Sequence, residues 1–206
     1  ELFHARRAYA LEPRNRHVCW TILTACGPAL APAADAEALP VAAEIAGRFP
    51  TDATVMLWLS RFYCARRREA EALECARRAA ALNPTWMDPQ AQLATVYHAF
   101  DRWEEAAELY QQLVERPDGQ RWRGAWGAVL KALNDPRADT VFAELCAERR
   151  AAGDDFGCGE VYEAWGKREA AIAAFQRCLS PPAAAKTTAL GRWAREALRR
   201  LGVEAS

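Results

Sequence analysis

The sequence lacks the groups that most enzymes need. Only three histidines occur among its 206 residues, and none has a cysteine or carboxylate at metal-ligand spacing. No serine sits in a G-x-S-x-G turn, and no cysteine–histidine pairing is indicated. Gly157-Cys158-Gly159 lacks the third glycine of a dinucleotide-binding turn, and Gly166-Lys167 lacks the upstream glycine of a phosphate-binding loop. We therefore expect a protein that is not an enzyme, with no catalytic residues, no cofactor and no metal.

An excess of charge of either sign is also missing. The 27 basic and 27 acidic residues cancel, whereas binding to a phosphate backbone requires a clear surplus of lysine and arginine. The short basic runs, such as Arg66-Arg67-Arg68, fit solvated helix faces. Neither a signal peptide nor a stop-transfer segment is visible. The sequence thus predicts neither a nucleic-acid partner nor a membrane partner.

Cysteine pairs at C-x-x-C spacing are absent, although cysteine itself is not rare. The seven cysteines are an odd number, and most stand where a small apolar residue would pack. We interpret them as free thiols in the core, which indicates a reducing, cytoplasmic setting. The residues concerned are Cys19, Cys26, Cys64, Cys75, Cys146, Cys158 and Cys178.

Long β-branched runs are absent too, and the abundant alanine, leucine, glutamate and arginine favour helices. A repeat emerges when Asp52–Trp86 is aligned with Trp86–Gln120 at an offset of 34 residues. Leucine, tyrosine, glutamate and alanine then coincide at four positions. The matching pairs are Leu59 with Leu93, Tyr63 with Tyr97, Glu71 with Glu105, and Ala72 with Ala106.

Each repeat is predicted to be a pair of helices, with proline ending the pair because proline cannot continue a helix. The prolines at 13, 50, 84, 117 and 182 have gaps of 37, 34, 33 and 65 residues, the last being about two repeats. The predicted units are 1–14, the end of a truncated preceding helix; 15–51, a degenerate hairpin; 52–86 and 87–118, two clear repeats; 119–151, a degenerate repeat; 152–185, a third clear repeat; and 186–206, a capping helix and tail.

Two packing expectations follow from this register. Ala72, Ala106 and Ala171 should lie where the two helices of a hairpin come closest. The capping helix, predicted over Lys186–Leu201, should bury one apolar face against the last repeat. That face is expected to comprise Leu190, Trp193, Ala197 and Leu201.

The order of large apolar residue, small residue, tyrosine, turn, Glu-Ala, aromatic residue, small residue and proline resembles the tetratricopeptide repeat, from about Asn15 to Ala185. Sel1-type repeats are the alternative, although these are usually longer and richer in glycine. The resemblance implies an all-α fold, a right-handed superhelical solenoid of antiparallel helix pairs. It also implies a scaffold for protein–protein interaction whose first helices line a concave groove for a peptide or protein segment.

Counting along those first helices predicts the groove residues. We expect Trp58 to anchor a ligand with an acidic stretch, and Trp20 is a further candidate, whereas the other tryptophans are expected to pack. The lysine and asparagine clamp that some relatives use for a chaperone's terminal carboxylate is absent, because Leu57 and Arg61 stand where it would begin. The predicted groove comprises Trp58, Arg61, Gln92, Thr95, His98, Arg123 and Lys131, with Glu160 and Glu163 adding acidic character beyond it.

Two alternatives remain open at this point. The repeats are compatible with a recognition arm of a larger enzyme, such as a glycosyltransferase, sulfotransferase or hydroxylase, and we expect Glu1 to lie within a longer polypeptide. They are also compatible with an oligomerisation module in which another copy occupies the groove, giving a homo-oligomer.

Overall fold

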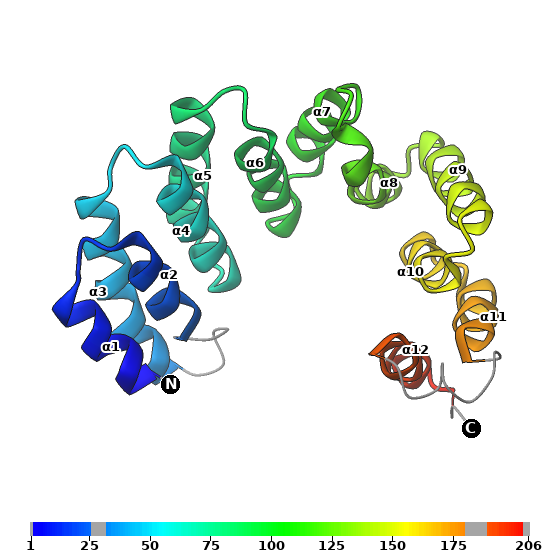
Figure 1. Ribbon diagram of the computed structural model, residues 1–206. Coiled ribbons are helices and arrows are strands. Elements are labelled where there is room, and N and C mark those ends of the chain that lie inside the picture. The colour runs from blue at the N-terminus through cyan, green and yellow to red at the C-terminus, as the bar shows by residue number, and fades with distance from the viewer. Residues whose placement is uncertain (1, 26–31, 180–188, 204–206) are drawn as a thin grey trace. The chain divides into compact units, whose positions relative to one another are not determined.

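The structure, a computed structural model, describes residues 2–25, 32–179 and 189–203, and within these ranges it contains helices and no strand (Figure 1). This confirms the predicted all-α class. Contacts within the chain define an N-terminal unit, Glu1–Leu113, and a C-terminal unit, Val114–Ser206. None of the described helices is both long enough and apolar enough to cross a bilayer.

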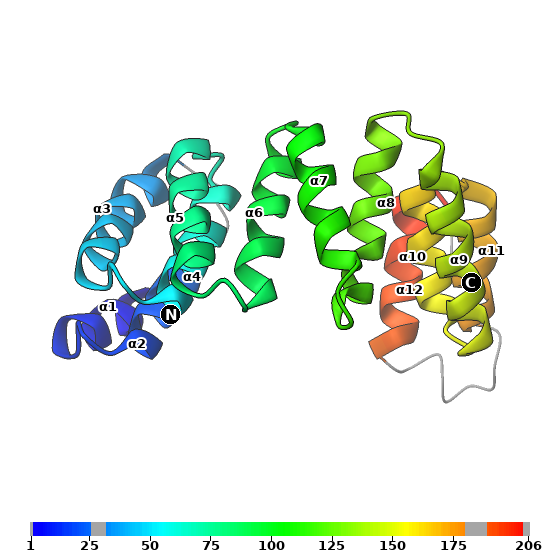
Figure 2. The same ribbon diagram turned by 90° about the horizontal axis from the view of Figure 1, so that it is seen from above.

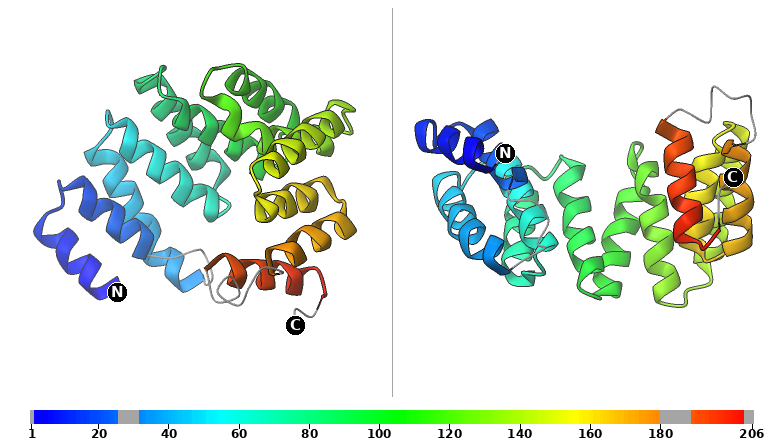
Figure 3. Two further views of the ribbon diagram at one scale, coloured as in Figure 1. Left: turned by 45° about the vertical axis from the view of Figure 1, so that its right-hand side comes forward. Right: turned by 90° about the horizontal axis from the view of Figure 1, so that it is seen from below.

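The N-terminal unit is built from successive antiparallel helix pairs, in which α4 packs on α5 and α5 packs on α6. The earlier helices α2 and α3 both contact α4, as the blue and cyan segments of Figure 3 show. The helices are α1 (Leu2–Leu11), α2 (Arg16–Ala25), α3 (Pro32–Arg48), α4 (Ala53–Ala65), α5 (Glu69–Leu82), α6 (Met87–Ala99) and α7 (Trp103–Val114).

The C-terminal unit repeats the same arrangement. Helix α8 pairs with α9, α10 with α11, and α12 packs against α11 (Figure 2). A short 3-10 helix, Gly119–Trp122, precedes α8. The helices are α8 (Arg123–Ala132), α9 (Arg137–Ala151), α10 (Asp155–Trp165), α11 (Arg168–Leu179) and α12 (Ala189–Arg200).

Small residues let the two helices of each hairpin approach closely. Ala72, Ala106 and Ala171 are all completely buried, as expected for the closest crossing of paired helices. Gly159 on α10 faces Phe175 on α11, and a Cβ at this position would lie less than 3.0 Å from three atoms of the phenyl ring. Glycine at 159 therefore leaves the space that the large ring fills.

The turns that join the two helices of a hairpin share one backbone conformation. Arg67, Asp101, Asn134 and Gly166 all have a positive φ, between 55° and 81°. The amide of the following residue then bonds back to a carbonyl five residues earlier, for instance Arg68 to Tyr63 at 3.0 Å. This is the bond that satisfies the free carbonyls at a helix end. The residues with positive φ therefore recur along the chain with about the same period as the side-chain repeat.

Two helix starts are set by local turns. Trp122 ends the 3-10 turn, so α8 begins at Arg123. Helix α6 begins at Met87 and carries Pro89 in its first turn, where proline is tolerated. Lys186 and the proline at 182, both used in the sequence-based predictions, lie outside the described residues.

The buried face of α12 was predicted wrongly in part. Leu190 is 44% and Trp193 59% exposed, whereas Ala194, Ala197 and Leu198 are buried against the preceding hairpin. Leu190 and Trp193 lie on one apolar stripe of α12, and Ala194 and Leu198 lie on a second stripe shifted by about one residue. The second stripe carries smaller residues, so α12 can pack more closely on the preceding hairpin through it. Two large apolar side chains are consequently left at the surface of the C-terminal unit.

The prediction of free thiols in the core is confirmed for most of the cysteines. Cys64 is half-buried, and Cys26 lies outside the described residues. Burial raises the pKa of each described thiol, to about 11 for Cys75 and Cys178, so these groups stay protonated at neutral pH. The buried thiols are Cys19, Cys75, Cys146, Cys158 and Cys178.

We expect Asp52→Ala to destabilise the N-terminal unit by about 1 kcal/mol, a typical cost of losing a helix cap. The Asp52 carboxylate accepts hydrogen bonds from the amides of Thr54, at 2.9 Å, and Val55, at 3.1 Å, at the start of α4. Urea denaturation followed by circular dichroism measures the change. Asp52→Asn keeps a capping oxygen and should lose less; equal losses for both variants would contradict the capping role.

Candidate functional site

A pocket of about 290 Å³ lies between α2 and α4 in the N-terminal unit. Among the residues that the structure describes, its lining combines aromatic and aliphatic side chains with two guanidinium groups and includes no carboxylate. The lining residues are Trp20, Leu23, Thr24, Trp58, Arg61, Phe62, Ala65 and Arg66. Such a surface suits an apolar side chain that is accompanied by negative charge.

The aromatic wall of the pocket comes from two helices of the N-terminal unit. Trp20 on α2 and Trp58 on α4 lie with ring centroids 5.1 Å apart at an angle of 40°. Trp20 remains 38% exposed, and Trp58 is half-buried. Both were candidates from the sequence, and the structure brings them into contact. Large aromatic residues that stay accessible are typical anchors at protein interfaces.

The two guanidinium groups of the pocket contact an amide side chain and an aromatic ring, respectively. The Nε of Arg61, an exposed residue, donates to Oε1 of Gln92 at 3.4 Å, which leaves the charge of Arg61 uncompensated by that contact. Arg66 is 7% exposed and lies over the Phe62 ring, 3.8 Å from its centroid. A fixed cation on an aromatic face costs little further ordering when a carboxylate binds.

The other predicted groove residues of the N-terminal unit, Gln92, Thr95 and His98, make contacts with neighbouring side chains of that unit. Gln92 is buried and reaches the pocket only through Arg61. The Thr95 hydroxyl donates to the carbonyl of Ala91 at 2.8 Å and lies 3.0 Å from the hydroxyl of Tyr110. His98 lies 5.3 Å from the Trp103 ring, and burial lowers its pKa, with Asp101 opposing the shift. His98 is therefore neutral at pH 7 and adds no positive charge.

The two predicted residues of the C-terminal unit are engaged within that unit. Arg123 is ion-paired with Glu144 and with Glu148, the latter at 2.5 Å, both from α9. These pairs offset the charge of Arg123 within the C-terminal unit. Lys131 is exposed and donates to the carbonyl of Ala164 at 3.0 Å. Neither residue lines the pocket between α2 and α4.

Two features of the pocket were missed by sequence reasoning. Phe62 is buried on α4, and its ring also supports Arg66 at the pocket. Arg66 was assigned to a solvated helix face, and its burial could not be foreseen from a run of three arginines. Trp165, which was expected to pack, stacks on Phe142 at 5.9 Å and donates to Asp139 of the preceding hairpin, whereas Trp193 remains 59% exposed.

Metal binding has no support among the residues that the structure describes. No group of three or more histidine, cysteine, aspartate or glutamate side chains converges there.

Comparison with known proteins supports this interpretation of the fold. Residues 91–121 match the family model described as tetratricopeptide repeat. A tetratricopeptide repeat protein from Parabacteroides merdae is 15% identical, with a TM-score of 0.59 over 98% of this chain and 84% of that chain. No curated protein sequence matches the chain.

Two further solved structures share the fold. The structure of the APC/C hetero-tetramer Cut9-Hcn1 is 15% identical, with a TM-score of 0.53 over 96% of this chain and 39% of that chain. YrrB, described as a TPR protein with an unusual peptide-binding site, is 16% identical, with a TM-score of 0.50 over 93% of this chain and 97% of that chain. At these identities the likeness concerns the fold.

Proposed function

We propose that this chain, which shares the tetratricopeptide repeat fold, is a helical scaffold for protein interaction and holds a peptide segment of its partner in the pocket between α2 and α4. The observation that carries the proposal is the contact between Trp20 and Trp58 beside the guanidinium of Arg61. YrrB, which shares the fold, has a peptide-binding site according to its description.

The chemistry of the lining defines the segment. An apolar or aromatic side chain would pack against the two indoles, and an adjacent aspartate or glutamate would pair with Arg61. A segment with acidic residues next to an apolar one therefore suits this pocket, whereas a basic segment would meet the like charge of Arg61.

The test begins with a random peptide library displayed on phage and selected against the full chain. We expect enriched peptides to share an apolar residue next to an acidic one. Fluorescence anisotropy of one labelled enriched peptide then measures affinity. Trp58→Ala combined with Arg61→Ala should weaken binding at least about tenfold, equivalent to about 1.4 kcal/mol.

A matched control removes one apolar and one basic side chain outside the pocket. Leu11 is 75% exposed and Arg14 is exposed, and neither lines the pocket. The double variant Leu11→Ala, Arg14→Ala should bind the peptide as the unaltered protein does. If the pocket variant also keeps full affinity while its helical signal is intact, the peptide binds elsewhere and the proposed site is wrong.

A further inference from the structure

A second pocket, of about 460 Å³, lies in the C-terminal unit and has the opposite charge character. Its aromatic side chains come from both helices that form it. The lining residues are Phe156 and Glu160 from α10, and Trp193, Glu196 and Arg200 from α12. It shares no residue with the pocket between α2 and α4.

Helical spacing explains why these side chains converge. Phe156 and Glu160 are four residues apart on α10, and Trp193, Glu196 and Arg200 are three and four residues apart on α12, so each set shares one helix face. The Phe156 and Trp193 rings lie 6.3 Å apart at 45°. The other face of α12 fixes its position, because Ala194, Ala197 and Leu198 are buried. Trp193 is thus held in place while it stays 59% exposed.

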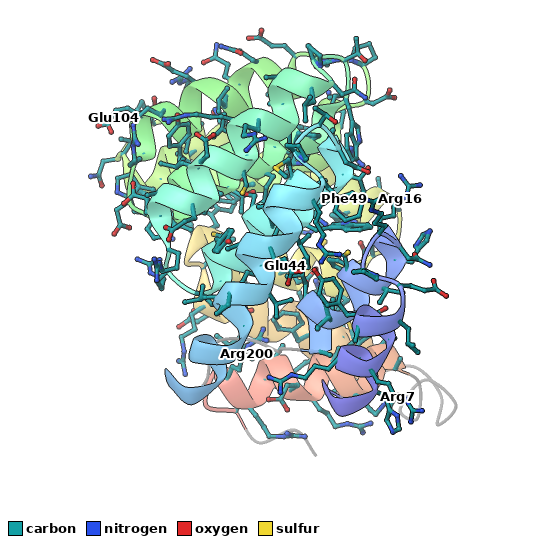
Figure 4. All side chains as sticks on the ribbon, turned by 90° about the vertical axis from the view of Figure 1, so that its left-hand side faces the viewer. Arg7, Arg16, Glu44, Phe49, Glu104 and Arg200 are labelled. Carbon is teal, nitrogen blue, oxygen red and sulfur yellow. The ribbon has the colours of Figure 1, made fainter. Side chains whose placement is uncertain are left out.

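The charged side chains that line the pocket are only partly paired with other charged residues of the C-terminal unit. Arg200, labelled in Figure 4, donates to Glu163 of α10 at 3.1 Å, so its cation is already paired. Glu196 pairs with Arg199 at 2.6 Å, with both side chains more than half exposed, and such surface pairs are weak. Glu160 is the remaining carboxylate of the lining.

The surroundings of Glu160 favour the approach of a cation. Partial burial raises the pKa of its carboxyl, the Asp154 carboxylate raises it further, and Glu163 adds to the same effect, while Arg149 and Arg200 act in the opposite direction. The ionised form of Glu160 is therefore less stable than that of an ordinary surface glutamate. A positive group placed beside Glu160 would offset its repulsion from the Asp154 and Glu163 carboxylates.

We propose that this pocket binds an arginine side chain of a protein partner, with the guanidinium stacked on the Trp193 indole and paired with Glu160. A planar guanidinium can stack on an aromatic ring and bond to a carboxylate at its edge, which an ammonium group does less well. The same chain uses this stacking elsewhere: Arg121 lies 4.0 Å from the centroid of the Trp122 ring. The site is independent of the pocket between α2 and α4.

The experiment uses the full chain labelled with ¹⁵N and the blocked peptide acetyl-Gly-Arg-Gly-amide as probe. The indole N–H signal of Trp193, assigned by its loss in Trp193→Phe, should shift saturably as the peptide is added. The same peptide with citrulline, which has the shape of arginine without its charge, should leave the signal in place. The lysine peptide should bind more weakly than the arginine peptide. The Trp58 signal should stay unchanged.

The decisive variant is Glu160→Gln, which keeps the size of the side chain and removes the charge. It should weaken binding of the arginine peptide about fivefold, as expected when a charged hydrogen-bond partner is lost. The control Glu104→Gln removes an exposed carboxylate in the N-terminal unit and should have no effect. The proposal is overturned by equal shifts with arginine and citrulline, by equal affinity for lysine, or by unaltered binding in Glu160→Gln.

Discussion

Replacing Phe175 by alanine is expected to lower the free energy of unfolding of the C-terminal unit by about 3–5 kcal/mol, the usual cost of deleting a buried phenyl ring. Phe175 is completely buried on α11. It packs against Phe156 at 5.5 Å and fills the space that Gly159 leaves on α10. Because glycine has no side chain that could move into the cavity, relaxation after the substitution should be small.

Urea denaturation monitored by near-ultraviolet circular dichroism measures this loss. The matched control is Phe156→Ala, which removes the same atoms from a half-buried ring and should cost less. A loss below about 1 kcal/mol for Phe175→Ala would be typical of a surface site, and would contradict the packing of α10 against α11.

Replacing Ala106 by leucine should destabilise the N-terminal unit by about 1–3 kcal/mol, because additional methylene groups in a filled core force other side chains apart. Ala106 is completely buried near the start of α7, at the position that Ala72 and Ala171 occupy in their own hairpins. Leucine is a good helix former, so the loss would arise from packing rather than from helix propensity.

The control for this substitution is Ala81→Leu on α5, where the alanine is exposed. A surface change of this kind is expected to stay within about 0.5 kcal/mol. The midpoint of urea denaturation compares the two variants. If both variants unfold at the same urea concentration, Ala106 does not lie at the closest crossing of its hairpin.

The candidate site was predictable in its parts but not as a pocket. The sequence indicated Trp20, Trp58 and Arg61 because each lies on a first helix, away from the apolar stripe of its own hairpin. It did not reveal that the two indoles meet at 5.1 Å, since that contact depends on how one hairpin packs on the next. The burial of Arg66 over Phe62 likewise depends on that packing.

The sequence by itself determined the helical class, the hairpin unit and the small residues at the crossings. These features are periodic: a repeat of about 34 residues places Leu, Tyr and Ala at equivalent positions, and proline ends each pair for a local steric reason. The turn residues with positive φ obey the same period even where glycine is absent. Local chemistry is sufficient for all of them.

Only the tertiary structure decided which of two apolar stripes on α12 is buried and which charges are already paired. Gly191, Ala194 and Leu198 are buried, whereas Leu190 and Trp193 remain exposed. Small side chains on the buried stripe let α12 approach the preceding hairpin closely. Arg123 likewise looked like a free groove cation, yet Glu144 and Glu148 of the next helix pair with it. Such outcomes depend on contacts between residues distant in sequence, which the spacing along one helix does not specify.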